Sequence, residues 1–202
     1  TDFYARNIAE IYTRYETILT QNNALDFDDL LMRIAFLLRD HGDIRRALSN
    51  RYRYLLVDEY QDTNHAQYLI AQALASEHDN YCATGDPDQS IYAWRGADIR
   101  NILDFEKDFP NATTVLLEEN YRSVQPILTC ASNLISCNTS RKDKRLFTTR
   151  EGGDNVRIIL VDDEQHEARE IANRIDALRT NEGMPYNEMA IFYRVNSLSR
   201  VL

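Results

Sequence analysis

The stretch YLLVDEYQD, residues 54–62, joins a continuous apolar run to a cluster of acidic and amide side chains. The run Tyr54–Val57 is short and does not alternate with polar residues, which is typical of a strand in a parallel sheet that is covered on both faces. In such sheets ligands bind at the carboxyl ends of the strands. The side chains that follow Val57 are therefore expected to lie at a ligand-binding edge.

The rest of the chain alternates between helical and strand-like patterns. Apolar residues recur with helical spacing in five segments that we expect to be helices: Ile8–Leu19, Phe27–Leu38, Ala66–Leu74, Val124–Ile135 and Ala168–Leu178. Asp26 is the expected N-cap of the second helix, and Asp62 or Thr63 that of the third. Four further apolar runs are expected to be strands: Tyr81–Thr84, Thr113–Leu117, Val156–Val161 and Met189–Tyr193. Strands that alternate with helices predict an α/β fold.

The composition excludes several classes of protein. The chain has 202 residues, 44% hydrophobic and 27% charged, so we expect a globular protein of one or two domains. No apolar run approaches the roughly 18 residues of a membrane span, and no signal-peptide pattern opens the chain. The cysteines form no CxxC pair, which predicts reduced thiols, mostly buried, and the histidines lack metal-ligand spacing. A net charge of −9 argues against a uniformly basic surface but leaves a local basic patch open. The pair Gly152-Gly153 is the strongest local linker signal.

Two carboxylates follow the first strand directly. Asp58 can hold Mg²⁺, directly or through water, and Glu59 can orient or deprotonate an attacking water. This is the physical content of a Walker B motif. Acidic residues also favour the N-terminus of a helix for electrostatic reasons alone, so the pair by itself leaves both interpretations open.

The second strand leads into a long polar loop, GDPDQSIYAWRGA, residues 85–97. Gln89 can both donate and accept hydrogen bonds, which suits a sensor of water or of a phosphate oxygen. Tyr92, Trp94 and Arg95 place two flat rings and a cation within four residues, a combination suited to base stacking and phosphate contact. The alternative for Trp94, the only tryptophan in the chain, is packing in a core.

Polar groups also follow two of the later strand runs. Arg122, in the stretch EENYRS after residue 117, could reach a phosphate in an adjacent cleft. The alternative is a surface salt bridge with Glu118 or Glu119, worth at most about 1 kcal/mol. Arg194 and Asn196 follow the last run, where ligand contact and simple helix capping by Asn196 are both open.

Taken together, the loops are more specific than any one of them. The sequences DEYQD, GDPDQSIYAWRGA and LEENYRS, in this order and spacing, resemble motifs II, III and IV of the UvrD/Rep/PcrA helicases. The upstream ALDFDDLL and the downstream AIFYRVNSLSRVL are also similar to that family, so the resemblance covers essentially the whole chain. It implies parts of two RecA-like, parallel-sheet motor domains with flanking helices, from a superfamily-one translocase that uses ATP and Mg²⁺.

The resemblance also implies roles around the nucleotide. Asp58 would bind the Mg²⁺ of MgATP, and Glu59 would activate the hydrolytic water. Gln89 would couple the γ-phosphate to the loop that faces DNA. Tyr121 would pack near the adenine, and Arg122 would contact the γ-phosphate in the manner of an arginine finger.

A second group of residues would contact the nucleic acid. By the same resemblance, Tyr92 and Trp94 would stack on the bases of single-stranded DNA, and Arg95 would support their loop. Arg194 and Asn196 would touch the strand from the second motor domain. The expected substrates are single-stranded DNA and junctions of single- and double-stranded DNA, in DNA repair or replication. The expected location is the bacterial cytoplasm, at the nucleoid.

The motifs present do not include the phosphate-binding P-loop. No glycine of the chain is followed by lysine, so these 202 residues contain no Walker A motif. The family places that motif upstream and motifs V and VI downstream, so the resemblance implies an internal fragment of a longer helicase. Its expected parts are residues 1–22 of a helical insertion (1B), residues 23–116 of motor domain 1A and residues 117–202 of motor domain 2A.

If the chain is an internal fragment, two properties of the isolated chain are expected. Alone, it is expected to hydrolyse little or no ATP, and the open edges of its incomplete sheets favour self-association. The alternative from another class is a helicase-like module without a P-loop, which acts as a non-enzymatic platform for nucleic acid or a partner protein. A helicase with a fused nuclease is a third possibility.

Overall fold

The computed structural model describes residues 3–139 and 141–202, and the chain divides into two compact units, residues 1–150 and 151–202. The boundary lies beside Gly152 and Gly153, whose φ angles are +79° and +90°. Glycine adopts this left-handed backbone region without the steric cost that other residues meet there. The expected linker thus coincides with the division between the units.

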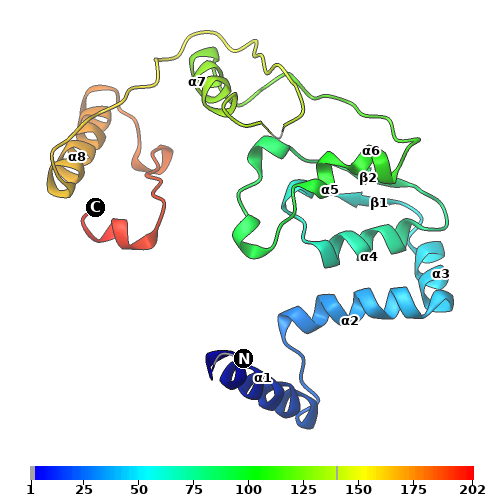
Figure 1. Ribbon diagram of the computed structural model, residues 1–202. Helices are drawn as coiled ribbons and strands as arrows, with labels where there is room; N and C mark the ends of the chain where they lie inside the picture. Colours follow the sequence, from blue (N-terminus) through cyan, green and yellow to red (C-terminus); the bar gives the residue numbers. More distant parts are fainter. Residues whose placement is uncertain (1–2, 140) are drawn as a thin grey trace. The chain divides into compact units, whose positions relative to one another are not determined.

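The first unit holds the sheet and most of the helices (Figure 1). Its longer helices are α1 (Phe3–Gln21), α2 (Phe27–Asp40), α3 (Gly42–Arg51), α4 (His65–Ala75) and α7 (Gln125–Ile135), and its short helices are α5 (Arg100–Leu103) and α6 (Phe105–Asp108). The strands are β1 (Leu55–Val57) and β2 (Tyr81–Ala83). Three 3₁₀ turns lie in the loops after these strands: η1 (Tyr60–Asp62), η2 (Pro87–Gln89) and η3 (Ala93–Arg95).

The two strands form a parallel pair, in which Leu55 is opposite Tyr81 and Val57 is opposite Ala83. Figure 1 shows the pair between α4 and the short helices α5 and α6. On one side an aromatic cluster packs edge to face: the Tyr60 ring lies 5.6 Å from Phe105, and Tyr81 lies 5.2 Å from Phe109. Tyr60 is completely buried. Because β1 and β2 are parallel, the loops that follow them meet at one edge, as the α/β interpretation predicts.

The helix boundaries follow local capping chemistry. The Asp26 side chain accepts a hydrogen bond from the Asp29 backbone N–H, which confirms Asp26 as the N-cap of α2. The expected cap of α4 was wrong: neither Asp62 nor Thr63 but Asn64 caps the helix. Asn64 forms a reciprocal capping box with Gln67, at 2.9 Å in both directions.

Three of the five expected strands do not form among the described residues. The runs 113–117, 156–161 and 189–193 are irregular, with no ladder to a neighbouring strand. Their side chains are open to solvent, as Leu117 (77% exposed), Leu160 (91%) and Phe192 (93%) show. A parallel strand exists only through hydrogen bonds to neighbours brought up by long crossovers, so an apolar run without a partner remains irregular.

Helix α3 is an element that the apolar spacing did not reveal. Its ten residues carry only Ile44, Ala47 and Leu48 as apolar side chains, too few for a clear helical stripe. It forms because it packs on α2 and α4. The burial expected for the cysteines was also wrong, since Cys82, Cys130 and Cys137 are free and exposed.

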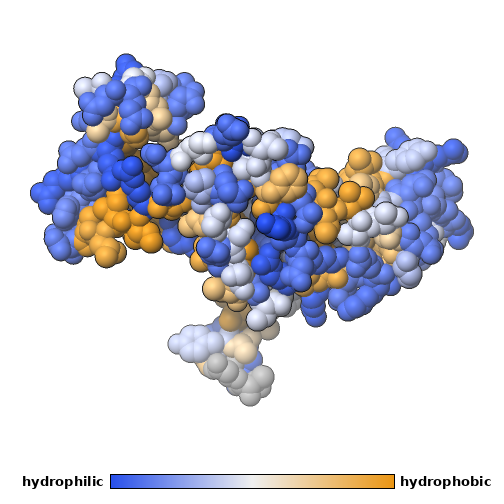
Figure 2. Space-filling model, turned by 90° about the horizontal axis from the view of Figure 1, so that it is seen from above, coloured by the Kyte–Doolittle hydropathy of each residue, from blue (hydrophilic) through white to orange (hydrophobic). Residues whose placement is uncertain are grey.

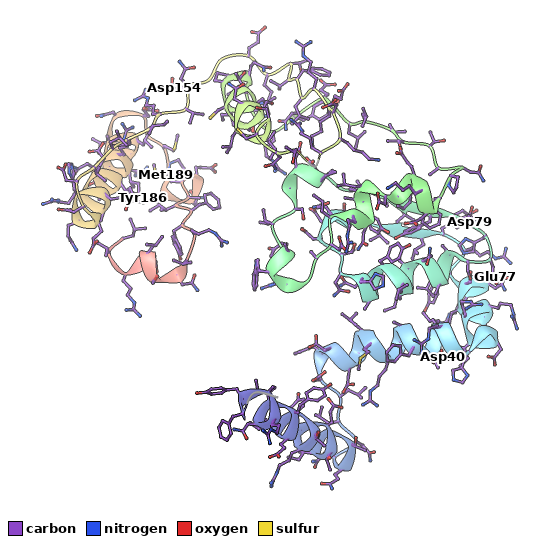
Figure 3. All side chains as sticks on the ribbon, viewed as in Figure 1. Asp40, Glu77, Asp79, Asp154, Tyr186 and Met189 are labelled. Atoms are coloured by element: carbon purple, nitrogen blue, oxygen red, sulfur yellow. The ribbon has the colours of Figure 1, made fainter. Side chains whose placement is uncertain are left out.

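The second unit consists of α8 (Glu164–Asn181) and two 3₁₀ turns, η4 (Tyr186–Glu188) and η5 (Asn196–Arg200). Asp163 caps α8 by accepting a hydrogen bond from His166 N–H at 2.7 Å. Figure 3 labels Tyr186 and Met189 in the segment that follows the helix. The apolar stripe of α8 and this segment line one shallow groove, formed by Ile171, Ile175, Leu178, Met184 and Met189 among others.

The surface leaves many apolar side chains open. Figure 2 shows hydrophobic residues in orange between the hydrophilic ones on the face in view. On α1 most of the apolar stripe is exposed, including Ile8 at 66% and Ile11 at 69%. No helix in the described part of the chain is long and apolar enough to cross a membrane.

Candidate active site

Asp58 and Glu59 lie at the carboxyl end of β1, next to the polar loop of residues 85–97 that follows β2. Asp58 and Glu59 directly follow β1, and both are exposed. The Tyr60 backbone N–H donates to the Thr84 carbonyl at 3.0 Å, and Thr84 N–H donates to the Val57 carbonyl at 2.8 Å. These backbone hydrogen bonds join the starts of the two loops without any contribution from side chains.

Glu59 has an unusual backbone conformation for its residue type. Its φ and ψ angles are 51° and 42°, in the left-handed region, and it precedes the turn η1. Its backbone N–H donates to Asp58 Oδ1 at 3.0 Å. This bend directly follows β1, where both carboxylates are exposed.

Gln61 connects the two loops through its side chain. Its Nε2 donates to Glu59 Oε2 at 2.7 Å, and its Oε1 accepts from Asp86 N–H at 2.9 Å. The Gln61 backbone carbonyl accepts a further hydrogen bond from Ser90 Oγ at 3.3 Å. Gln61 is 1% exposed, so its amide is held away from water by the groups it joins.

The close approach of the loops depends on a glycine. A Cβ atom at Gly85 would lie 2.5 Å from Gln61 Oε1, 2.9 Å from Ile102 Cδ1 and 3.1 Å from Tyr60 N. One of these atoms is backbone, so the neighbours cannot all move aside. Gly85 is therefore the residue that lets the second loop lie against the first.

Gly85→Ala is expected to destabilise the first unit by about 1–3 kcal/mol, because the added methyl overpacks the junction of the loops. The measurement is the urea midpoint of the 202-residue chain. Gly96→Ala is the informative comparison, since its Cβ would meet nothing within 4 Å and only its φ of +87° opposes the substitution. A Gly85→Ala midpoint equal to that of the wild type would show that the loops do not pack in this way.

Asp86 and Asp88 tie the polar loop to a basic segment far along the chain. The Asp86 carboxylate pairs with Lys144 and also accepts from Gln89 Nε2 at 2.8 Å. Asp88 Oδ2 lies 3.1 Å from Arg141 Nη2 and 3.2 Å from Lys144 Nζ. These groups are largely shielded, since the side chain of Asp88 is 8% exposed and that of Lys144 is 17%. Ion pairs in such surroundings are less weakened by salt than pairs on an open surface.

The ionisation of Asp86 reflects these contacts. Burial opposes its charge, but hydrogen bonds from Lys144, Gln89 and the Asp88 backbone outweigh burial and lower the pKa of Asp86. A lowered pKa in the folded state means that ionised Asp86 stabilises the fold fully only above its unfolded-state pKa.

Asp86→Asn therefore tests whether the ionised Asp86 carboxylate stabilises the folded state. The free energy of unfolding of the wild type should exceed that of the variant by a constant amount above about pH 5. The difference should shrink as the pH falls below the ordinary Asp value of 3.8 and through the lower folded pKa. Urea unfolding, followed by the fluorescence of Trp94 as the only tryptophan, measures it. A difference that grows on acidification would contradict the assignment.

The same loop brings three further candidate residues together. The Tyr92 and Trp94 rings lie 6.4 Å apart at an interplanar angle of 45°. The Arg95 guanidinium lies 4.6 Å from the centre of the Trp94 ring and 5.2 Å from that of Tyr92. Trp94 is 67% exposed, so the alternative of core packing is not what the structure shows. The cluster offers two exposed rings, Trp94 the more open of them, next to a cation.

Two further candidate residues, Tyr121 and Arg122, lie in the loop before α7. The Tyr121 hydroxyl donates to Glu119 Oε2 at 2.7 Å, and this carboxylate raises the pKa of Tyr121. The Asn120 side chain accepts from the backbone N–H groups of Arg122 and Ser123. Glu118 accepts from Arg145 N–H, and in the part of the chain that the structure describes neither Glu118 nor Glu119 forms the salt bridge with Arg122 that was the alternative. Within the described residues the Arg122 guanidinium forms no ion pair, which leaves it free for an anionic ligand.

Arg194 and Asn196 belong to the second unit, and both are exposed. Asn196 is the first residue of η5 rather than its cap, which is Val195. Of the two alternatives left open for Asn196, ligand contact and helix capping, the structure therefore does not show capping. Its backbone carbonyl instead accepts from Ser199 Oγ at 2.7 Å.

The carboxylates at the end of β1 fit a Mg²⁺ ion that takes its other ligands from phosphate and water. No group of three or more potential metal ligands exists within residues 3–139 and 141–202. Mg²⁺, however, is commonly held by one or two carboxylates together with substrate phosphates and water. Asp58 is exposed at the strand end, and among the residues that the structure describes only its Oδ1 accepts a hydrogen bond, from Glu59 N–H. The site thus suits a metal that arrives with a phosphate ligand.

Two features of this site were not predicted from the sequence. They are the Gln61–Asp86 hydrogen bond, which joins residues 25 positions apart, and the Lys144–Asp86 ion pair, which joins residues 58 positions apart. Gln61 could have been noticed as an amide between carboxylates in DEYQD. The excess of basic residues after residue 140 gave a signal for Lys144, but nothing local shows which acids they meet.

Comparison with known proteins gives consistent matches over the chain. A model of the UvrD/REP helicase N-terminal domain matches residues 1–110, and one of the UvrD-like helicase C-terminal domain matches residues 115–202. The chain is 46% identical over 209 residues to the ATP-dependent DNA helicase UvrD1 of Mycobacterium tuberculosis, covering 100% of the chain and 27% of the relative. It is 45% identical over 202 residues to the ATP-dependent DNA helicase PcrA of Staphylococcus aureus, covering 100% of the chain and 28% of that protein. The chain spans less than a third of the length of these relatives.

Proposed function

Because the chain belongs to the UvrD/REP helicase family, we propose that it forms part of a longer ATP-driven helicase that moves along single-stranded DNA and unwinds duplex. One observation carries the proposal. The loop that holds Gln89 and the exposed ring of Trp94 is joined by hydrogen bonds to the strand end that holds Asp58 and Glu59. A nucleotide site and a DNA contact thus share one connected piece of structure.

The chemistry assigned to the strand end follows from the residue types. Bound Mg²⁺ would neutralise charge on the phosphates, and Asp58 is the residue that would hold it. Glu59 orients the attacking water and accepts its proton. Gln89 is connected to the same edge by Asp86, which accepts a hydrogen bond from Gln89 Nε2 and donates one to Gln61. The Gln89 amide can contact a phosphate oxygen. Arg122, with a guanidinium free of ion pairs in the described chain, stabilises charge that develops on the transferred phosphoryl group.

The DNA contact is assigned to the aromatic end of the loop. Trp94 and Tyr92 stack on bases, a contact that tolerates any sequence because every base has a flat face. Arg95 holds the two rings in place. Tyr121 is assigned to the adenine, and Arg194 and Asn196 to the DNA strand. The proposal extends to junctions between single- and double-stranded DNA, to a role in repair or replication and to a location with the nucleoid.

The domain boundaries proposed for the chain are unchanged: residues 1–22 in a helical insertion, 23–116 in the first motor domain and 117–202 in the second. For the isolated chain we propose self-association through unpaired edges of β1 and β2. Sedimentation over a range of concentrations tests this, and a monomer at every concentration would contradict it.

The test of the function is MgATP hydrolysis with and without single-stranded DNA. The longer protein should hydrolyse ATP and be stimulated by DNA, whereas the 202-residue chain alone, which lacks a Walker A motif, should show little or no turnover. A longer protein that binds DNA but never hydrolyses ATP would instead support the second candidate, a non-enzymatic platform. DNA-stimulated turnover by the chain alone would require another group in place of the P-loop.

A further inference from the structure

We propose that Gln61 is a positioning residue: it orients the Glu59 carboxylate and ties it to the loop that carries Gln89 and Trp94. The inference rests on the function proposed above, in which Glu59 activates water. It adds a specific side chain that passes the state of the DNA-facing loop to the residue that acts on the nucleotide.

The hydrogen bonds of Gln61 fix its amide in one orientation. A carboxylate can only accept and a backbone N–H can only donate, so Nε2 must face Glu59 and Oε1 must face Asp86. The distances, 2.7 Å and 2.9 Å, are those of well-formed bonds. A flipped amide would place like groups together at both ends. Gln61 therefore holds Glu59 Oε2 at a defined point relative to Asp86.

Packing prevents the Gln61 side chain from adjusting independently. It is 1% exposed, and the Gly85 backbone lies against its Oε1, where even a methyl group would approach to 2.5 Å. Ser90, three residues after Pro87 in the same loop, donates to the Gln61 carbonyl at 3.3 Å. Movement of this loop must therefore move Gln61 or break its hydrogen bonds.

The contacts of Asp86 show which changes in the polar loop would reach Glu59 through the hydrogen bonds of Gln61. Its backbone N–H binds Gln61, while its carboxylate binds Gln89 and Lys144. A change in the contacts of Gln89 with phosphate, or of the ring cluster with DNA, would thus reach Glu59 through one buried side chain. The strand ends are joined separately by the backbone bonds between Tyr60, Thr84 and Val57, so replacement of Gln61 can disconnect Glu59 without separating the strands.

The test compares Gln61→Glu with Gln61→Met in the longer helicase. Glu keeps an acceptor for Asp86 N–H but loses the donor to Glu59, whereas Met loses both. In each variant kcat for DNA-stimulated ATP hydrolysis should fall about 10- to 100-fold, as for a misplaced catalytic group. The KM for MgATP should stay within about twofold, because Gln61 does not contact the nucleotide in the proposed site. The ratio of DNA-stimulated to basal turnover should also fall.

Gln67→Glu is the matched control, because it makes the same change of charge six residues away. Glu serves in a capping box as well as Gln does, so this variant should keep the wild-type kcat and the wild-type stimulation by DNA. Turnover is expressed per site that binds a fluorescent ATP analogue, so unfolded protein is not counted.

The outcomes separate the two proposals. If both Gln61 variants keep the wild-type kcat and DNA stimulation while Glu59→Gln is inactive, the positioning role is wrong and the proposed function stands. If Glu59→Gln keeps its turnover, the proposed function of Glu59 is wrong, whatever Gln61 does. A rise of KM with an unchanged kcat would place Gln61 in nucleotide binding and would also overturn the positioning role.

Discussion

Glu59→Gln is expected to lower the ATP turnover of the longer helicase by about 10³-fold, while MgATP still binds. A general base contributes roughly 10²- to 10⁴-fold to such a reaction, and glutamine has almost the same shape but cannot accept the proton from water. The amide oxygen of Gln at position 59 can still accept the hydrogen bond from Gln61 Nε2, so the site should keep its structure. Steady-state hydrolysis with saturating single-stranded DNA, together with equilibrium binding of MgATP, separates the two effects.

Glu77→Gln provides the control for this substitution. Glu77, labelled in Figure 3, is exposed and lies after α4, before the amino end of β2 rather than at its carboxyl end. It loses the same charge, and its turnover should equal that of the wild type. Equal turnover for Glu59→Gln and the wild type would remove Glu59 from catalysis, and loss of MgATP binding in Glu59→Gln would assign it to the nucleotide instead.

Trp94→Ala is expected to weaken binding of single-stranded DNA by about 5- to 150-fold, since one stacked base contributes roughly 1–3 kcal/mol. The substitution removes the exposed ring and the partner of the Arg95 guanidinium at 4.6 Å. More DNA should be needed for half-maximal stimulation of hydrolysis, while hydrolysis without DNA stays unchanged. Fluorescence anisotropy of labelled oligonucleotides and the DNA dependence of turnover measure the two quantities.

Trp94→Phe is the conservative counterpart, because phenylalanine keeps a flat face of smaller area. Its loss of affinity should be clearly smaller than that of Trp94→Ala. If both variants bind DNA as the wild type does, the ring has no part in DNA binding and its exposure in this chain has another explanation. If Trp94→Phe and Trp94→Ala lose affinity equally, stacking is not the contact that holds the base.

The sequence predicted those parts of the fold that depend on neighbours close along the chain. Asp26 caps its helix through a residue three positions away, and the apolar runs around Leu56 and Cys82 are each recognisable as a strand from their own residues, although their pairing joins positions 26 apart. The runs at 113–117, 156–161 and 189–193 look the same in sequence but do not form strands. A run of apolar residues specifies that it can pair, not that a partner lies beside it.

The candidate site shows the same division. The loops that carry Glu59, Gln89 and Trp94 could be found because their residue types are unusual after an apolar run. The side chain that connects them could not, since the contact of Gln61 with Asp86 spans 25 residues and depends on the register of the strands. The cap of α4 was misplaced by one or two residues because the turn η1 extends to Asp62 and shifts the start of the helix.

The left-handed backbone of Glu59 sets folding and activity against each other at this one position. Glycine, and next asparagine, adopt φ near +51° at lower cost than glutamate, so the local backbone alone would favour their substitution there. A library of all variants at position 59, scored once for abundance in cells and once for helicase-dependent survival, should therefore rank asparagine above most residues in the first screen. Only glutamate should score well in the second, which is the signature of a residue retained for chemistry at some expense of stability.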